Sequence, residues 1–310
     1  MINSSKVSII MNCYNGEKFL EESVNSILNQ TFSNWELIFW DNASTDNSLK
    51  IIKLFKDKRI KVFKSKINYP LGQARNLALQ KSQGEFIAFL DCDDVWMPKK
   101  LSLQIPKFKS EKVGLVITDT IFFNKNNQEK QLYKKIKPKE GNVFKELLKN
   151  YFISLETVVI RKKSLDTLDH YFDDRFQMIE EYDLFLRIAH KWQLAYVDQV
   201  LAKWRVHNNS WTWRRSELFP IERIMMIEKF KSLIPQFEKS YADELIFLKN
   251  LIRYEEAINL WSKRKNFEAR KKIKPLINLS LKWSILHLLM FFPFNFFTTI
   301  KKIKGDILPK

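Results

Sequence analysis

Short apolar runs alternate with longer amphipathic stretches over about the first 120 residues of the chain. The runs are rich in β-branched and aromatic residues, which predicts buried strands at 6–12, 35–41, 60–64, 85–91 and 113–123. The stretches between them carry apolar residues at helical spacing, which predicts helices at 17–30, 44–55, 71–82 and 97–108. This repeated order of strand and helix predicts an α/β fold with a Rossmann-like, mostly parallel sheet flanked by helices.

The pattern changes in the second half of the chain. It predicts a helix at 177–192 and strands at 194–198 and 201–207, followed by helices only. The Trp- and Arg-rich stretch SWTWRRSE marks the expected domain boundary. We therefore expect a first domain over 1–212 and a helical, basic C-terminal region over 213–310.

The last part of that region, residues 281–304, is apolar and aromatic at first and basic at its end. A membrane-spanning helix needs roughly 20 apolar residues. Polar residues and a proline interrupt the run here, at Lys282, Ser284, His287, Pro293 and Asn295. This favours a segment that lies in the membrane interface with its lysines on anionic lipid. The alternative is that the segment packs on the chain's own helices.

The net charge of +18 favours anionic partners, and half of this excess lies in residues 221–310. Nucleic acid, an acidic membrane or a phosphorylated ligand would each fit, and a solvated lysine-rich surface would need no partner. Because the excess is concentrated near the apolar tail, we expect a membrane surface and no nucleic acid. The start, MINSSKVSII, lacks the features of a signal peptide, so we expect a cytoplasmic protein. The two cysteines, Cys13 and Cys92, give no disulfide framework and no CxxC spacing.

Polar clusters follow three of the predicted strands: NCYN at 12–15, DNASTD at 41–46 and DCDD at 91–94. In a parallel sheet, ligands bind at the carboxyl ends of the strands, so the three clusters are expected to share one edge. Asp91 and Asp93 are two residues apart and point to one face, which suits Mg²⁺ or Mn²⁺. No glycine-rich phosphate loop is present, so metal and arginine would hold a phosphate. Taken alone, such a pair of aspartates is more typical of a solvent-exposed turn.

Four ordered motifs together resemble family 2 glycosyltransferases with the GT-A fold. They are VSIIMNCYNGEKFLEESVNSILNQTF, ELIFWDNASTDNS, GQARNLALQKSQGEFIAFLDCDDVW and EEYDLFLR, and the resemblance covers roughly residues 6–210. It implies a glycosyltransferase domain that uses a nucleotide-diphosphosugar, most often a UDP-sugar, with inversion at the anomeric carbon. It also implies Mg²⁺ or Mn²⁺ as the cofactor. The acceptor implied is a glycan or lipid-linked intermediate of cell-surface polysaccharide synthesis, at the inner face of the cell membrane.

The resemblance also assigns roles by position. The first cluster would face the base and ribose through Asn12, Cys13, Tyr14 and Asn15, where the family usually has Pro-Thr at the first two positions. The second cluster would read the base through Asp41 and Asn42, and the third helix would face the diphosphate through Arg75 and Asn76. The third cluster would bind metal and donor through Asp91, Cys92 and Asp93, with Asp94 in support.

The helix EEYDLFLR would carry the catalytic base, which the resemblance places at Glu181, with Glu180 as the alternative. A carboxylate in reach of an acceptor hydroxyl accelerates transfer by about 10²–10⁴-fold. His207 would reach the metal or the diphosphate. The plain alternative for this helix is an acidic face that pairs with its own basic residues.

Two other functions fit parts of the sequence. DCDDV also matches the nucleophile loop of haloacid-dehalogenase-type phosphatases, with Asp91 as nucleophile and Asp93 as acid/base. That loop normally follows the first strand of its domain, whereas here about three strand–helix units come first. The net charge alone would fit a non-enzymatic protein that binds an anionic partner.

Overall fold

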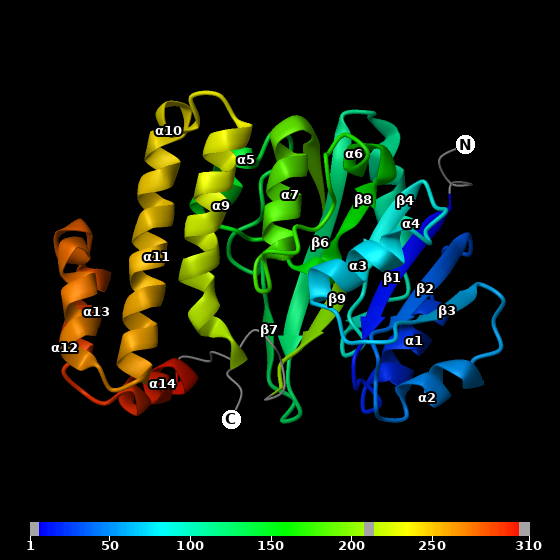
Figure 1. Cartoon of the computed structure of the whole chain (residues 1–310), viewed down its shortest axis with the longest axis horizontal. Coiled ribbons are helices and arrows are strands. Elements are labelled where there is room, and N and C mark those ends of the chain that lie inside the picture. The colour runs from blue at the N-terminus through cyan, green and yellow to red at the C-terminus, as the bar shows by residue number, and fades with distance from the viewer. Residues whose placement is uncertain (1–5, 208–213, 304–310) are drawn as a thin grey trace. The chain divides into compact units, whose positions relative to one another are not determined.

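The computed structural model describes residues 6–207 and 214–303, which fall into two compact units (Figure 1). The first unit is Met1–Phe144 with Phe152–Arg205, and the second is Lys145–Tyr151 with Val206–Lys310. The second unit thus includes a short segment near residue 150 that the sequence pattern placed in the first domain.

The first unit contains a nine-stranded sheet in the order β3-β2-β1-β4-β8-β6-β9-β5, with β7 paired to β6. The strands are β1 Val7–Cys13, β2 Trp35–Asp41, β3 Ile60–Lys64, β4 Phe86–Phe89, β5 Val95–Trp96, β6 Val113–Phe123, β7 Glu129–Gln131, β8 Val159–Arg161 and β9 Gln193–Arg205. Strands β1 to β4 pair in parallel, as the alternating pattern predicts. The predicted α/β class with flanking helices is confirmed.

The other half of the sheet is mixed. Strand β8 runs antiparallel to both β4 and β6, whereas β9 runs parallel to β6. The two strands predicted at 194–198 and 201–207 are one continuous strand, β9. Its register to β6 shifts where Asp198 and Gln199 interrupt the apolar pattern, opposite the step from Thr118 to Asp119. A polar interruption that suggests a turn in the sequence is therefore an irregularity within one strand.

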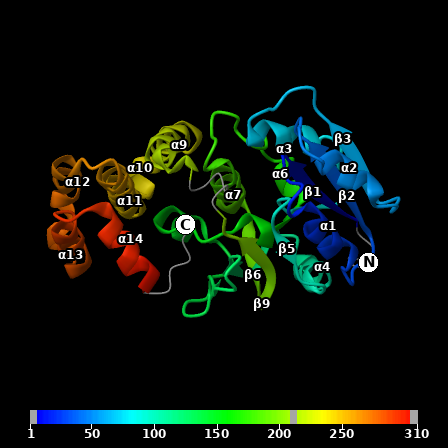
Figure 2. The ribbon, with the colours of Figure 1, turned by 90° about the horizontal axis from the view of Figure 1, so that it is seen from below.

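Helices cover both faces of this sheet (Figure 2), with α3 and α7 on one side and α1 and α4 on the other. The helices are α1 Leu20–Leu28, α2 Ser48–Leu54, α3 Leu71–Leu79, α4 Lys100–Gln104, α6 Lys162–Leu165 and α7 Glu180–Lys191. The main core packs α1, α2 and α4 against β1, β2 and β4, and includes Leu20, Val24, Ile52, Leu101 and Phe39. Because one face of each strand is buried in this core, the register of the parallel strands is strongly specified.

The second unit is helical. Its helices are α9 Phe219–Leu233, α10 Phe237–Ser240, α11 Ala242–Ser262, α12 Asn266–Ile273, α13 Leu281–Leu289 and α14 Phe294–Ile303. Trp261 lies at the centre of its core with Ile273, Leu286 and Met290, and its indole N–H donates to the Phe292 carbonyl at 2.8 Å. No helix within 6–207 or 214–303 is long and apolar enough to cross a membrane. Helix α5, Phe144–Lys149, lies at the boundary of the two units in the chain.

Candidate active site

The three polar clusters meet at one edge of the parallel sheet. Strand β1 pairs with β2 so that Cys13 lies beside Asp41, and it pairs with β4 so that Ile10 lies beside Phe89. The backbone N–H of Asn42 donates to the Cys13 carbonyl at 2.7 Å, which joins the first two clusters. The third cluster begins two residues after β4 ends. Adjacent parallel strands that end together therefore place side chains from three distant segments at one candidate site.

The side-chain amide of Asn12 has no hydrogen-bond partner among the described residues. The side chain is buried, yet neither Nδ2 nor Oδ1 has a hydrogen bond within the part of the chain that is described. On β2, Asp41 Oδ2 is likewise buried and has no hydrogen-bond partner among the described residues. The other oxygen of this carboxylate, Oδ1, accepts a hydrogen bond from the Ser44 N–H at 3.3 Å. Buried polar atoms are nearly always hydrogen-bonded in native proteins. These atoms are therefore positioned to take partners from a bound ligand or ordered water.

Other residues of the first two clusters bond to the protein itself. Asn15 has a left-handed backbone (φ 53°), and its Oδ1 accepts from the Thr45 N–H at 2.8 Å. The Asn42 amide donates to Asn68 Oδ1 at 2.7 Å and bonds to the backbone of Tyr69. Both side chains thus hold loops in place. Tyr14 is half exposed and available to a ligand.

Arg75, on α3, lies at the centre of the acidic groups. Its Nη1 donates to Glu180 Oε1 at 2.8 Å, and its Nη2 donates to Asp91 Oδ1 at 3.1 Å. Nη1 also lies 3.9 Å from Glu181 Oε2. Burial alone would lower the pKa of Arg75, but Asp91 and Glu180 outweigh it and raise the pKa, so the guanidinium stays charged. The predicted diphosphate residue is thus a buried bridge between the aspartate cluster and helix α7.

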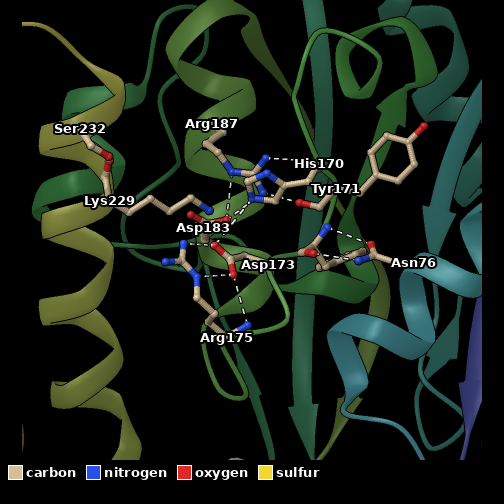
Figure 3. Close-up of polar contacts among 10 residues, drawn as sticks. Asn76, His170, Tyr171, Asp173, Arg175, Asp183, Arg187, Lys229 and Ser232 are labelled. Carbon is tan, nitrogen blue, oxygen red and sulfur yellow. Dashed lines mark hydrogen bonds and ion pairs between the residues drawn. The ribbon is translucent and has the colours of Figure 1, made fainter.

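Asn76, its neighbour on α3, contacts the backbone alone. Its Nδ2 donates to the Phe172 carbonyl at 2.8 Å and its Oδ1 accepts from the Phe172 N–H at 3.0 Å (Figure 3). This pair fixes the loop before α7 to α3. A loop fixed in this way helps to position the acidic start of α7.

Glu181 is the more accessible of the two glutamates at the start of α7. Its side chain is 25% exposed, against 2% for Glu180. Burial and the neighbouring charge of Glu180 raise the pKa of Glu181 to about 8, and Arg75 opposes this rise. A carboxyl with a pKa near neutrality is suited to proton transfer at physiological pH.

The aspartates of the third cluster differ in their surroundings. Asp91 is partly exposed, and burial raises its pKa, with Arg75 opposing and Asp93 adding to the rise. Asp94 is buried, and burial together with Asp93 raises its pKa well above the ordinary range. Its Oδ1 accepts from the Arg205 N–H at 2.8 Å, and the Asp93 carbonyl accepts from Arg205 Nε at 2.7 Å. Asp94 and Arg205 therefore hold the loop, while Asp91 and Asp93 offer the hard oxygen donors that Mg²⁺ and Mn²⁺ take.

A second acidic group, which the sequence did not suggest, lies on α7 and the loop that precedes it. One ligand atom from each of His170, Asp173 and Asp183 lies within 4.8 Å of the others. Figure 3 shows that both carboxylates face arginines: Arg175 Nη2 lies 2.6 Å from Asp173 Oδ2, and Arg187 Nη2 lies 2.8 Å from Asp183 Oδ2. Two guanidinium charges already balance the two carboxylates. This charge balance favours an ion-pair network over a metal site.

The two cysteines also meet at the candidate site. Cys13 ends β1 and is buried, and Cys92 follows β4 and is half-buried. A hydrogen bond from the Cys92 thiol lowers the pKa of Cys13, and the same bond together with burial raises the pKa of Cys92 well above its ordinary range. His207 belongs to the second unit and is half-buried.

A parallel half-sheet with carboxylates at its edge and an acidic helix beside it is the arrangement expected of a nucleotide-sugar transferase of the GT-A class. Solved structures of this class share the fold. The mannosyltransferase PcManGT of Pyrobaculum calidifontis, in complex with GDP-Man and Mn²⁺, aligns with a TM-score of 0.64 at 17% identity, over 96% of this chain and 84% of its own. TarS of S. aureus, in complex with UDP-GlcNAc, aligns with a TM-score of 0.56 at 19% identity, over 86% of this chain and 88% of its own.

The chain belongs to glycosyl transferase family 2, whose family model matches residues 8–169. It is 36% identical to the Escherichia coli UDP-Glc:alpha-D-GlcNAc-diphosphoundecaprenol beta-1,3-glucosyltransferase WfgD, over 59% of this chain and 69% of that protein. It is 30% identical to the putative teichuronic acid biosynthesis glycosyltransferase TuaG of Bacillus subtilis, over 66% of this chain and 80% of that protein. The predicted family, enzyme class and nucleotide-sugar transfer are confirmed, which favours sugar transfer over the phosphatase and binding-protein alternatives.

Proposed function

We propose that this glycosyltransferase transfers a sugar from a UDP-sugar to a hydroxyl of a lipid-linked or cell-surface glycan acceptor, with inversion. The observation that carries the proposal is the bridge made by Arg75, which joins Glu181's helix to Asp91. Arg75 thereby holds the helix of Glu181, the proposed base, at a fixed distance from Asp91, a proposed metal ligand. Proximity of this kind contributes a large part of the rate in group-transfer enzymes.

In this mechanism Glu181 accepts the proton of the acceptor hydroxyl as that oxygen attacks the anomeric carbon. Its partial exposure leaves room for an acceptor, whereas Glu180 is occupied by Arg75. Asp91 and Asp93 would hold Mg²⁺ or Mn²⁺, which offsets the charge that develops on the departing diphosphate. Asn12, Cys13 and Asp41 line the part of the site assigned to the nucleoside. Attack from the side opposite the diphosphate accounts for inversion.

The named relatives support the choice of donor and acceptor. WfgD is named for a UDP-glucose donor and an undecaprenol diphosphate-linked acceptor. TarS structures contain UDP and UDP-GlcNAc, whereas the PcManGT structure contains GDP-Man. The relative with the higher sequence identity carries more weight for the donor, and it favours a UDP-sugar.

A thermal-shift screen tests the donor directly, because a ligand that binds the folded state raises its apparent stability. UDP-, GDP- and dTDP-sugars are compared with and without Mn²⁺, and nucleoside diphosphate release is then measured with an undecaprenol-linked acceptor. We expect a Mn²⁺-dependent shift with a UDP-sugar only. A shift with GDP- or dTDP-sugars alone would overturn the donor assignment, and release of inorganic phosphate from a phosphomonoester would support the phosphatase alternative.

We also propose that the second unit docks on the inner face of the cell membrane. Helix α13 buries Leu286 in the core of its unit, yet Leu281, Ile285 and Leu288 are 75%, 47% and 61% exposed. Their spacing places these three residues on one side of the helix. Phe291, Phe292 and Phe296, which follow α13 in the chain, are also exposed, and Lys282 and Lys301 supply positive charge. An apolar surface with basic residues around it fits anionic lipid.

A further inference from the structure

The fold brings together the only two cysteines of the chain, which are far apart in the sequence. Strands β1 and β4 are parallel neighbours, and Cys13 and Cys92 lie at and just beyond their carboxyl ends. Both sulfurs pack against Gly16. A Cβ added there would lie 2.7 Å from Cys92 Sγ and 2.8 Å from Cys13 Sγ, so a residue without a side chain is required.

We propose that hydrogen peroxide oxidises Cys13 and Cys92 to a reversible disulfide, and that this disulfide weakens donor binding. A disulfide needs the two Cβ atoms about 3.5–4.5 Å apart. Two sulfurs that both lie against Gly16 require only local movement to reach this separation. No other thiol competes for either partner within the chain.

The chemistry balances with the peroxide as the oxidant. One sulfur of the pair attacks one peroxide oxygen, so an S–O bond forms, the O–O bond breaks and one water leaves. The other sulfur then attacks the oxidised one, so the S–S bond forms, the S–O bond breaks and a second water leaves. The two thiol hydrogens end in the two waters, and the peroxide is reduced.

The position of the pair gives the oxidation its effect, and this part rests on the proposed function. Cys92 lies between Asp91 and Asp93, so a shift of its backbone moves both carboxylates. Cys13 follows Asn12, whose amide lacks a protein partner among the described residues. The disulfide would therefore distort the metal and nucleoside parts of the site together, and reduction would restore both.

The test treats reduced, full-length protein with hydrogen peroxide and follows two measurements. Intact mass and thiol alkylation report the disulfide; we expect a monomer that has lost two hydrogens and has no alkylatable cysteine. Thermal shift with UDP-sugar and Mn²⁺ reports donor binding; we expect affinity to fall about tenfold or more and to return with dithiothreitol. The variants Cys13→Ser and Cys92→Ser are each compared with their own reduced form, and both should keep their donor affinity after peroxide.

Several results would overturn the proposal. Both cysteines could remain alkylatable after peroxide, or the disulfide could form only between molecules. Donor affinity could also stay unchanged in the disulfide form, or fall equally in both serine variants. If the reduced protein binds no nucleotide sugar, the proposed function fails, and the mass measurement still decides whether the pair oxidises.

Discussion

Arg75 and Glu180 form a buried ion pair at 2.8 Å, with 3% and 2% of their side chains exposed. The same guanidinium donates to Asp91, so α3, α7 and the aspartate loop share one cation. A buried charge with two anionic partners is stable only when all of them are present. The ion pair therefore fixes the spacing between the group proposed to bind the donor and the group proposed to activate the acceptor.

The substitution Arg75→Lys tests this role. Lysine keeps the charge but cannot donate to two carboxylates through a planar fork, so we expect kcat to fall about 10²-fold because the reacting groups are misplaced. Steady-state kinetics at saturating donor measures it. Arg59→Lys, on the opposite edge of the parallel strands, is the matched control and should keep its kcat. A wild-type kcat in Arg75→Lys would refute the positioning role.

The substitution Glu181→Gln removes the proposed base while it keeps the size of the side chain. We expect kcat to fall by about 10²–10⁴-fold with little change in donor affinity. Transfer rates and a donor titration separate the two effects. Glu129→Gln, at an exposed site, is the control. If kcat fell in Glu180→Gln and not in Glu181→Gln, Glu180 would be the catalytic base instead of Glu181.

Glu181 also predicts how the rate depends on pH. Burial raises the pKa of Glu181 to about 8, and a general base acts in its deprotonated form. The rate constant kcat/KM of the wild type should therefore rise with pH and level off above about 8. The rise should disappear from the residual activity of Glu181→Gln. A wild-type rate that is flat between pH 6 and 9, or that falls, would contradict the assignment.

The two acidic groups of the first unit can be told apart by metal titration. We expect Asp93→Asn to need at least about tenfold more Mn²⁺ for half-maximal rate, because it loses a carboxylate ligand. We expect His170→Ala to leave the Mn²⁺ dependence unchanged, because Arg175 and Arg187 already pair with Asp173 and Asp183. The opposite result would place the metal at the histidine group.

Membrane docking is tested with vesicles. The double substitution Ile285→Glu with Leu288→Glu places charge on the exposed side of α13, so binding to phosphatidylglycerol vesicles should fall about tenfold or more. Sedimentation with vesicles measures it. Ile67→Glu, an exposed apolar site in the first unit, is the control. Equal binding of wild type and the double variant, or equal binding of wild type to neutral phosphatidylcholine, would refute this surface.

Glu36 predicts a pH dependence of stability. Burial by itself would raise the pKa of Glu36, but hydrogen bonds from Lys6, Lys61 and Ser8 outweigh it and lower the pKa to about 2. The ionised form is therefore stabilised in the folded state, by about 3 kcal/mol relative to an ordinary glutamate. This contribution is complete above the unfolded pKa of about 4.5 and is lost as the pH falls toward 2.

Glu36→Gln should thus lower the free energy of unfolding at pH 7 by about 3 kcal/mol, with a smaller difference at pH 3. Urea denaturation at both pH values measures the two differences. Glu111→Gln, at an exposed position, should change neither. If the free energy of unfolding fell equally at both pH values, the packing of the side chain, and not the charge of Glu36, would account for the effect.

Much of the fold could be predicted because the parallel strands are both apolar and regularly spaced. Strand β8 was missed because three residues carry too little pattern to distinguish a strand from a loop. Its antiparallel pairing with β4 and β6 then sets the order of the mixed half of the sheet. The sequence pattern predicts two strands in place of β9, separated at Asp198. It does not show that a register shift between β6 and β9 lets one strand continue through two polar residues.

The three strand-end clusters were predictable from topology, since parallel neighbours end at one edge. Side-chain partners were not predictable. Arg75 and Glu180 are 105 positions apart, and nothing in either segment specifies the other. Asn42 and Asn76 have the residue types of ligand-binding positions, but the fold gives their amides backbone partners. Only the packed structure distinguishes an amide that is available from one that is already bonded.

The contacts of Arg205 have a consequence for how the two units communicate. Arg205 is the last residue of the first unit, and Val206 begins the main part of the second. The same residue bonds through its backbone N–H to Asp94 and through its side chain to the Asp93 carbonyl. One of the covalent connections between the units, the step from Arg205 to Val206, therefore starts at a residue bonded to the aspartate loop. A pull on the chain at Val206 must either displace that loop or break these two bonds, so this connection is mechanically coupled to the groups proposed to bind the donor.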